Sequence, residues 1–207
     1  DWSHDSRFIV AGTRTFRSVI NPQQRDYAQL IVLDRVNGNI VRQVVTQDET
    51  IFGVQWSPDR AFIATTAPSG AVRVYDAATL ELLTTTSGTE EYPAEPDFSP
   101  FGARLVYGRS VSQANMETSP RLEGITTTSL VGGAVEIIVP APSPARLASI
   151  AAACNAPQSV TRALPAQAND AAVARFETAL AALPADVIPP ACEADLRAVA
   201  EALAAGT

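Results

Sequence analysis

The sequence predicts a mainly β chain with a separate α region. Up to about residue 139, short apolar runs alternate with clusters of Gly, Pro, Asp and Ser. These clusters end each run before a helical period develops, which favours antiparallel strands. Segments of similar sequence recur through this part at a constant spacing. After Pro140 the strands stop, and Ala-rich segments with helical periodicity follow.

Composition narrows the classes of function. The chain has 207 residues, enough for one large domain or two small ones, and 46% of its residues are hydrophobic. Its net charge of −7 argues against a nucleic-acid partner, because binding to phosphates needs a basic surface. No apolar run approaches the roughly 20 residues that a membrane-spanning helix needs, so we expect no membrane span.

A repeat organises the β part. Trp2–Ala11 aligns with Trp56–Ala64 and with Phe98–Tyr107, each with a serine directly after the aromatic residue. A second motif, a strand with a turn after it, recurs at residues 31–34, 72–76 and, in degenerate form, 135–139. The repeat unit that contains Trp56 is the most regular of the three, with strands expected at 52–56, 61–66, 71–75 and 80–84.

The repeat spacing is 42 residues, both from Asp34 to Asp76 and from Trp56 to Phe98. This is the length of one propeller blade. These residues resemble the blades of WD-repeat β-propellers, and Pro96–Pro100 is similar to the TolB-type variant. The resemblance covers residues 1–140 and implies about three blades, each of four antiparallel strands. No Trp-Asp pair ends the third strand of a blade, so the Asp/His network of WD repeats is not expected.

Three blades are fewer than the four to eight of a closed propeller. We therefore expect these to be the last blades of a longer propeller whose beginning lies upstream of Asp1. Pairing of the open sheet edges with a neighbouring subunit, or a sandwich of the strands, are the alternatives.

Two long connections interrupt the regular spacing, at Thr13–Tyr27 and from Arg109 to about Glu123. The equivalent connection of the second blade is only Ala67–Gly70, so the long loops would flank a notch above it. Long loops on a rigid scaffold often carry binding residues; the alternative is neutral insertions that pack on each other. The candidate binding residues on this loop face are Arg14, Phe16, Arg17, Arg25, Ser69, Arg109, Met116 and Arg121.

The C-terminal part is expected to be a small helical domain. The predicted order is propeller blades over residues 1–139, a Pro-rich linker over 140–145 and helices within 146–207. Apolar periodicity predicts helices at 146–155, 170–183 and 192–205, with a short one around 159–164. Asn169 or Asp170 is the expected N-cap of the second long helix.

Cys154 and Cys192 are the only cysteines, and each lies at the edge of a predicted helix. A disulfide between them would suit a domain with few large apolar residues and would indicate an oxidising compartment. The alternative is two buried free thiols in a cytosolic protein. A zinc site is disfavoured because the single histidine, His4, is far away in sequence.

No set of catalytic residues is recognisable. His4 stands at a turn position of the repeat, and no G-x-S-x-G sequence is present. We therefore predict a non-enzymatic protein without cofactor or metal: a protein-interaction or scaffold module of a secreted or cell-surface bacterial protein, within a larger complex. The alternatives are a structural subunit of an extracellular assembly and the accessory propeller of a hydrolase. The expected partner is a protein or a second copy, in an extracytoplasmic compartment.

Overall fold

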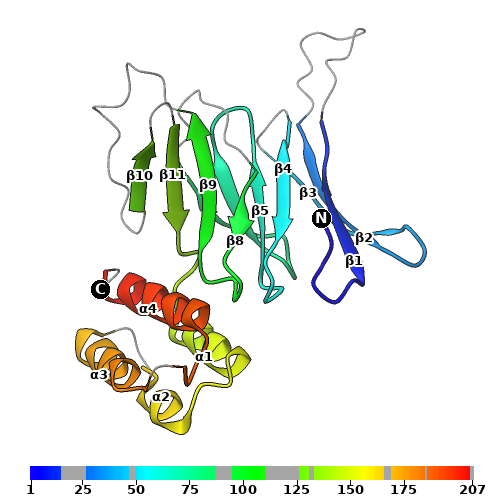
Figure 1. The fold of residues 1–207 in the computed structure, drawn as a ribbon. Helices are drawn as coiled ribbons and strands as arrows, with labels where there is room; N and C mark the ends of the chain where they lie inside the picture. Colours follow the sequence, from blue (N-terminus) through cyan, green and yellow to red (C-terminus); the bar gives the residue numbers. More distant parts are fainter. Residues whose placement is uncertain are drawn as a thin grey trace, which may run out of the picture. The chain divides into compact units, whose positions relative to one another are not determined.

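The computed structural model describes residues 1–14, 27–46, 50–86, 95–110, 126–130, 133–165, 169–184 and 186–205 (Figure 1). For residues 109–110, 126–130 and 133–137 it describes the backbone alone. The chain divides into two compact units. The first contains Asp1–Phe98 and most of the three strands that follow, and the second contains the turn Ser99–Leu105 together with the chain from Ile137 onward.

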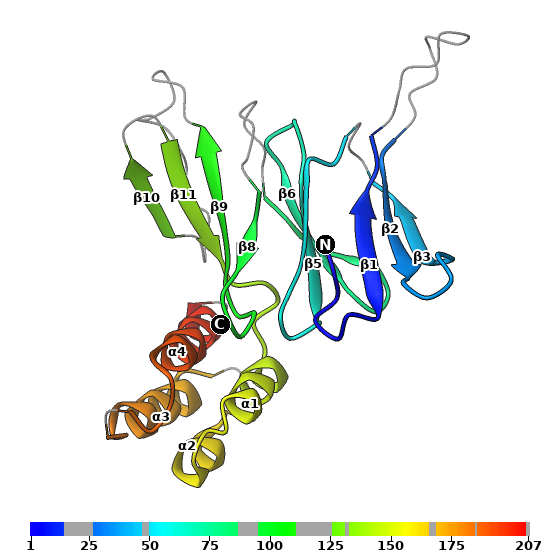
Figure 2. The ribbon, with the colours of Figure 1, turned by 45° about the vertical axis from the view of Figure 1, so that its right-hand side comes forward.

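The first unit contains three β-sheets, which stand side by side in Figures 1 and 2. Strand β4 contacts β1 of the first sheet on one side and β8 of the third sheet on the other. The first two sheets hold these strands: β1 (Phe8–Gly12), β2 (Gln29–Asp34), β3 (Ile40–Val45), β4 (Gly53–Trp56), β5 (Phe62–Thr66), β6 (Val72–Asp76) and β7 (Leu82–Thr85).

The second sheet confirms the predicted four-stranded unit. Its order is β4-β5-β6-β7, with each strand antiparallel to the next. Every residue of β5 is buried, including Thr65 and Thr66. The buried Thr66 hydroxyl has a hydrogen-bond partner, because its oxygen accepts a hydrogen bond from Gly53 N at 3.0 Å. A strand buried along its whole length fixes the register of the strands that pair with it.

The first sheet has the order β1-β2-β3, with Val10 opposite Val32. Residues before β1 pair with it, through a bridge between Trp2 and Ile9 and a hydrogen bond from Val10 N to Asp1 O at 2.8 Å. The hydrophobic core between the first and second sheets is built from alternating residues of β1 and β2 and from the second repeat: Val10, Leu30, Val32, Trp56, Ile63, Tyr75 and Leu80.

The repeat is visible in the turns as well as in the strands. The fourth residue after each repeat aromatic has a left-handed backbone, at Ser6 (φ 55°), Arg60 (φ 65°) and Gly102 (φ 74°). The turns after β2 and β6 share another such position, at Gly38 (φ 71°) and Leu80 (φ 61°). A positive φ at each of these equivalent positions supports a true structural repeat.

The third sheet departs from a simple meander. It contains β8 (Asp97–Phe98), β9 (Leu105–Ser110), β10 (Thr126–Leu130) and β11 (Gly133–Ile138), in the order β8-β9-β11-β10. Strand β11 lies beside β9 as β6 lies beside β5, which agrees with the degenerate motif at 135–139. Strand β10, which the sequence did not predict, occupies the outer place although it precedes β11 in the chain.

The second unit contains four helices within the residues that the structure describes, as predicted. They are α1 (Pro144–Ala153), α2 (Gln158–Ala163), α3 (Asp170–Ala181) and α4 (Pro190–Ala205). Asn169 is the N-cap of α3, because its side chain accepts a hydrogen bond from Ala172 N at 2.9 Å. Large apolar residues are few, and most of them face one core, which includes Leu147, Ile150, Val160, Val173, Phe176, Leu180, Leu196, Val199 and Leu203.

A disulfide joins Cys154, at the end of α1, to Cys192 in α4, as predicted, with 6.1 Å between the Cα atoms. The bridge closes 38 residues. On the chain-entropy model, such a loop contributes about 4 kcal/mol to stability. This contribution is large for a unit with so small a core.

The turn Ser99–Arg104 lacks a carboxylate that the two earlier repeat turns carry. In those turns Asp5 and Asp59 accept hydrogen bonds from the serine two residues before them, at 2.8 and 2.6 Å. Phe101 stands at the equivalent position of the third turn. Its ring packs against the helical core instead.

Asp195 of α4 supplies the missing carboxylate from another part of the second unit. It accepts hydrogen bonds from Ser99 Oγ at 2.7 Å and from Phe101 N at 3.3 Å, and it forms an ion pair with Arg104 Nε at 2.9 Å. Asp195 is fully buried. Arg146 of α1 also donates a hydrogen bond to the carbonyl oxygen of Gly102. The helices are therefore attached to this turn by polar contacts as well as by apolar packing.

Candidate functional site

The predicted loop face lies after β1, β5 and β9. Of its residues, the structure describes the side chains of Arg14 and Ser69, and both are exposed. The backbone of Arg14 forms an isolated antiparallel β-bridge with that of Thr50. Ser69 lies in a tight turn in which Gly70 N donates a hydrogen bond to Ala67 O at 3.0 Å. Arg109 is described only as backbone of β9. The other predicted residues lie outside the described ranges: Phe16, Arg17, Arg25, Met116 and Arg121.

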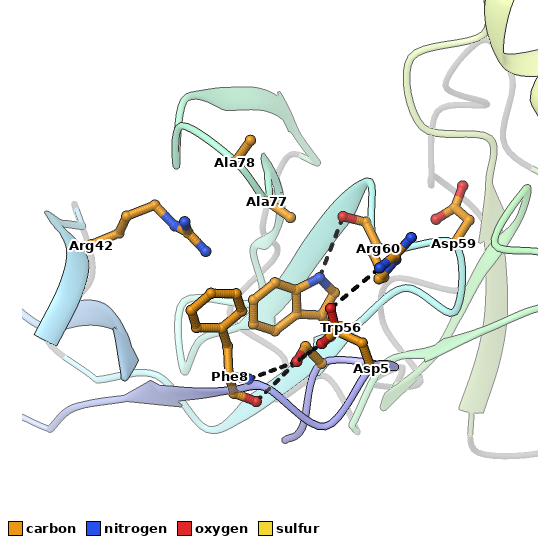
Figure 3. Close-up of a pocket in the computed structure, with 9 residues that line it drawn as sticks. Asp5, Phe8, Arg42, Trp56, Asp59, Arg60, Ala77 and Ala78 are labelled. Atoms are coloured by element: carbon orange, nitrogen blue, oxygen red, sulfur yellow. Dashed lines mark hydrogen bonds and ion pairs between the residues drawn. The ribbon is translucent and has the colours of Figure 1, made fainter. Parts of the chain in front are cut away.

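A cavity of about 370 Å³ lies at the opposite end of the first two sheets. We call it the Phe8–Trp56 cavity (Figure 3). Phe8 begins β1 and Trp56 ends β4, just before β5, so the cavity is at the start of the strands whose ends carry the predicted loops. The two repeat turns and the turn after β6 supply the remaining walls, with Arg42 from β3.

The floor of the cavity is aromatic. The Phe8 and Trp56 rings stack with their centroids 6.4 Å apart and an angle of 18° between their planes. The guanidinium carbon of Arg42 lies 5.2 Å from the centroid of the Phe8 ring, within the range of a cation–π contact. Arg7 makes a similar contact with Phe8 at 5.0 Å. Figure 3 shows Arg42 and Arg60 on opposite sides of the two rings.

The two carboxylates of the cavity are held by their own turns. Asp5 accepts hydrogen bonds from Ser3 Oγ at 2.8 Å and Arg7 N at 3.1 Å, and Arg60 pairs with it at 3.2 Å. The Ser3 hydroxyl is the main reason that the pKa of Asp5 lies below its usual range, with the Arg7 amide second. Asp59 likewise accepts from Ser57 Oγ at 2.6 Å.

Arg42 differs from these groups. Its Nε atom is buried, and no residue in the described part of the chain accepts a hydrogen bond from it. A buried donor without an acceptor costs about 1–3 kcal/mol. The cavity therefore combines a stacked aromatic floor with one guanidinium group whose Nε has no acceptor among the described residues.

The sequence did not identify this cavity. Phe8 and Trp56 were recognised as repeat residues, but their stacking depends on the contact between β1 and β4. The one usable signal was the recurrence of an aromatic residue near each repeat turn. Within the described ranges, no cluster of three or more His, Cys, Asp or Glu side chains could bind a metal ion. None of the helices in those ranges is both long and apolar enough to cross a bilayer.

Comparison with known proteins agrees with the repeat. Residues 26–95 match the family model of the Anaphase-promoting complex subunit 4 WD40 domain. A chain in the crystal structure of the Mitotic Checkpoint Complex is similar, with 17% sequence identity and a TM-score of 0.42. That match covers 53% of this chain and 31% of the solved chain. No curated protein matches. The predicted WD-repeat resemblance is confirmed, and the TolB-like variant stays a prediction.

Proposed function

We propose that this partial WD40-type propeller is a non-catalytic protein-interaction module that works outside the cytoplasm of a bacterium. The match of residues 26–95 to a WD40 domain carries the proposal. WD40 propellers typically serve as scaffolds on which other proteins assemble, and the matched family is named for a subunit of a multi-protein complex. A protein partner, in a larger complex, is therefore the expected ligand.

The disulfide supports the extracytoplasmic location. Cys154 and Cys192 are both buried and bridged, and no free cysteine exists in the chain. Structural disulfides persist in oxidising compartments and are rare in the cytosol, where thiols are kept reduced. A helical unit that gains about 4 kcal/mol from its bridge would lose much of its stability in the cytosol.

Thiol labelling in intact cells tests the location. The tagged natural gene product is quenched in acid, treated with polyethylene-glycol maleimide and compared with its Cys154→Ser/Cys192→Ser double variant; it should show no additional adduct before reduction and two additional adducts after it. A Cys154→Ser variant is the matched control, because its single remaining thiol should label without reduction. Two adducts on the unreduced wild-type chain in the cytoplasmic fraction would contradict the proposed compartment.

Site-specific photocrosslinking tests the interaction. Benzoylphenylalanine is placed at exposed Ser69 on the loop face, at exposed Ala78 beside the Phe8–Trp56 cavity, and at exposed Glu201 on α4 as the control. We expect a discrete adduct with another protein from one or both sheet positions. The same diffuse labelling at all three positions would argue against a protein-interaction role for the sheets.

The exposed side chains of β3 favour a second candidate function, a subunit of an extracellular assembly. Strand β3 is the edge of its sheet in the described structure, and Ile40, Val41 and Val45 are 51%, 44% and 61% exposed. Apolar edge strands can pair with another chain. Light scattering over a hundredfold concentration range should then show higher masses that a Val45→Lys variant loses. A monomer at every concentration would refute the assembly.

A further inference from the structure

We propose that the Phe8–Trp56 cavity binds an acidic side chain, Glu or Asp, of a partner protein, and that Arg42 is the residue that pairs with it. This inference rests on the proposed protein-interaction function and adds to it a second surface and the chemistry of the ligand. The surface lies at the end of the strands away from the predicted loop face.

The charged side chains that line the cavity indicate that its ligand is an anion. Asp5 is paired with Arg60 and accepts two further hydrogen bonds from its own turn. Asp59 accepts hydrogen bonds from Ser57 Oγ and from Ala61 N. Among the lining residues, Arg42 is the cation without a carboxylate partner in the described chain, and its buried Nε has no acceptor there. A carboxylate matches a guanidinium in charge and in geometry, and would approach Arg42 through the outer nitrogens of that group.

The surroundings of Arg42 favour a strong ion pair between its guanidinium group and the carboxylate of the ligand. Its side chain is only partly exposed, and its guanidinium group lies over the Phe8 ring at 5.2 Å. An aromatic floor excludes water from one side of the group, which weakens screening of an ion pair formed there. The ring also holds the guanidinium in place, so less side-chain freedom is lost on binding.

The open shape of the cavity favours a residue of a protein over a free small molecule. Small-molecule sites usually enclose 70–90% of their ligand. Here the side chains on one wall, Arg60 and Asp5, are 59% and 39% exposed. A ligand in a cavity with such a wall keeps one side in solvent, as a side chain projecting from a peptide does.

Peptide selection tests the proposal. The intact chain is used to select from a phage library of random nine-residue peptides, in parallel with an Arg42→Gln variant. Arg35→Gln is the matched control, because it removes the same charge from an exposed position in the turn after β2. We expect enriched peptides that share a Glu or Asp, and a loss of affinity of at least tenfold in Arg42→Gln but less than twofold in Arg35→Gln.

A second readout does not depend on the folding of Arg42→Gln. An Ala78→Glu variant adds a carboxylate at the exposed rim and should weaken the same peptide by several-fold. In a Trp2→Phe background, Trp56 is the only tryptophan, and its emission should shift when the peptide binds. Replacing the acidic residue of the peptide by its amide should remove both binding and shift.

The outcomes separate this inference from the proposed function. Peptides that bind the wild type and Arg42→Gln equally would overturn the cavity and leave the interaction module intact. Competition by free N-acetylglutamate as strong as by the peptide would overturn the protein origin of the ligand. Enrichment of no peptide at all would count against both.

Discussion

Replacing Asp195 by alanine should destabilise the helical unit more than any other single polar substitution in it. The substitution would leave three donors without their acceptor: Ser99 Oγ, Phe101 N and Arg104 Nε. Removing one partner of a buried ion pair costs about 3–5 kcal/mol. Because the Arg104 side chain is 33% exposed and water can solvate it, we expect the lower value, about 3 kcal/mol.

The positions of the chromophores allow a clean assay. Both tryptophans, Trp2 and Trp56, belong to the first unit, whereas the described helices all belong to the second. Circular dichroism at 222 nm therefore follows the helices, and tryptophan fluorescence follows the sheets. For a unit of this size, a loss of 3 kcal/mol lowers the midpoint of the helical transition by about 12–24 °C.

Two comparisons make the reasoning refutable. Asp59→Ala removes the carboxylate of the equivalent turn in the second repeat, where it is local and half-exposed, and should cost only about 1 kcal/mol. Phe101→Asp should cost less in the Asp195→Ala background than in the wild type, because it restores a carboxylate to the turn. A loss below about 1 kcal/mol in Asp195→Ala, or equal costs of Phe101→Asp in both backgrounds, would show that Asp195 does not replace the turn carboxylate.

The remaining predictions concern the repeat turns and the disulfide. Gly38→Ala should cost about 1 kcal/mol in urea unfolding and Ser6→Gly should gain a similar amount, because both positions have left-handed backbone and a Cβ at 38 would meet no atom. Cys154→Ser should lower the stability of the helices by about 4 kcal/mol, measured by circular dichroism. Ser3→Ala should raise the pKa of Asp5 in an NMR titration; since the folded pKa is depressed, Asp5 stabilises the fold at neutral pH and loses this effect as the pH falls through that pKa.

Local signals in the sequence predicted the elements well where the turns repeat. The four strands of the second sheet, the cap at Asn169 and the Cys154–Cys192 bridge all depend on residues close in sequence or on a pair with one possible partner. Turn residues act on their immediate neighbours, so their positions can be read without knowledge of the fold. The same holds for the α3 stripe that contains Phe176.

Contacts between distant segments could not be predicted in this way. Asp195 resembles any solvated acid on a helix until the turn at Ser99 is placed against it, 96 residues away in sequence. Arg42 resembles an exposed residue of an edge strand, and only the neighbouring Phe8 ring makes it part of a cavity. The outer place of β10 likewise follows from the packing of the third sheet, because no local pattern decides which strand joins β9.

The turn Ser99–Arg104 depends on the carboxylate of Asp195, and this dependence affects the order of folding during synthesis on the ribosome. The first two repeat turns contain their own aspartates and can close as soon as they emerge. The third turn cannot close until the 96 residues from Ser99 to Asp195 have been synthesised, which takes about 5–20 s at typical rates of translation. During that interval the serine and arginine of the turn have no acceptor, so we expect this turn to be the last of the three to become native.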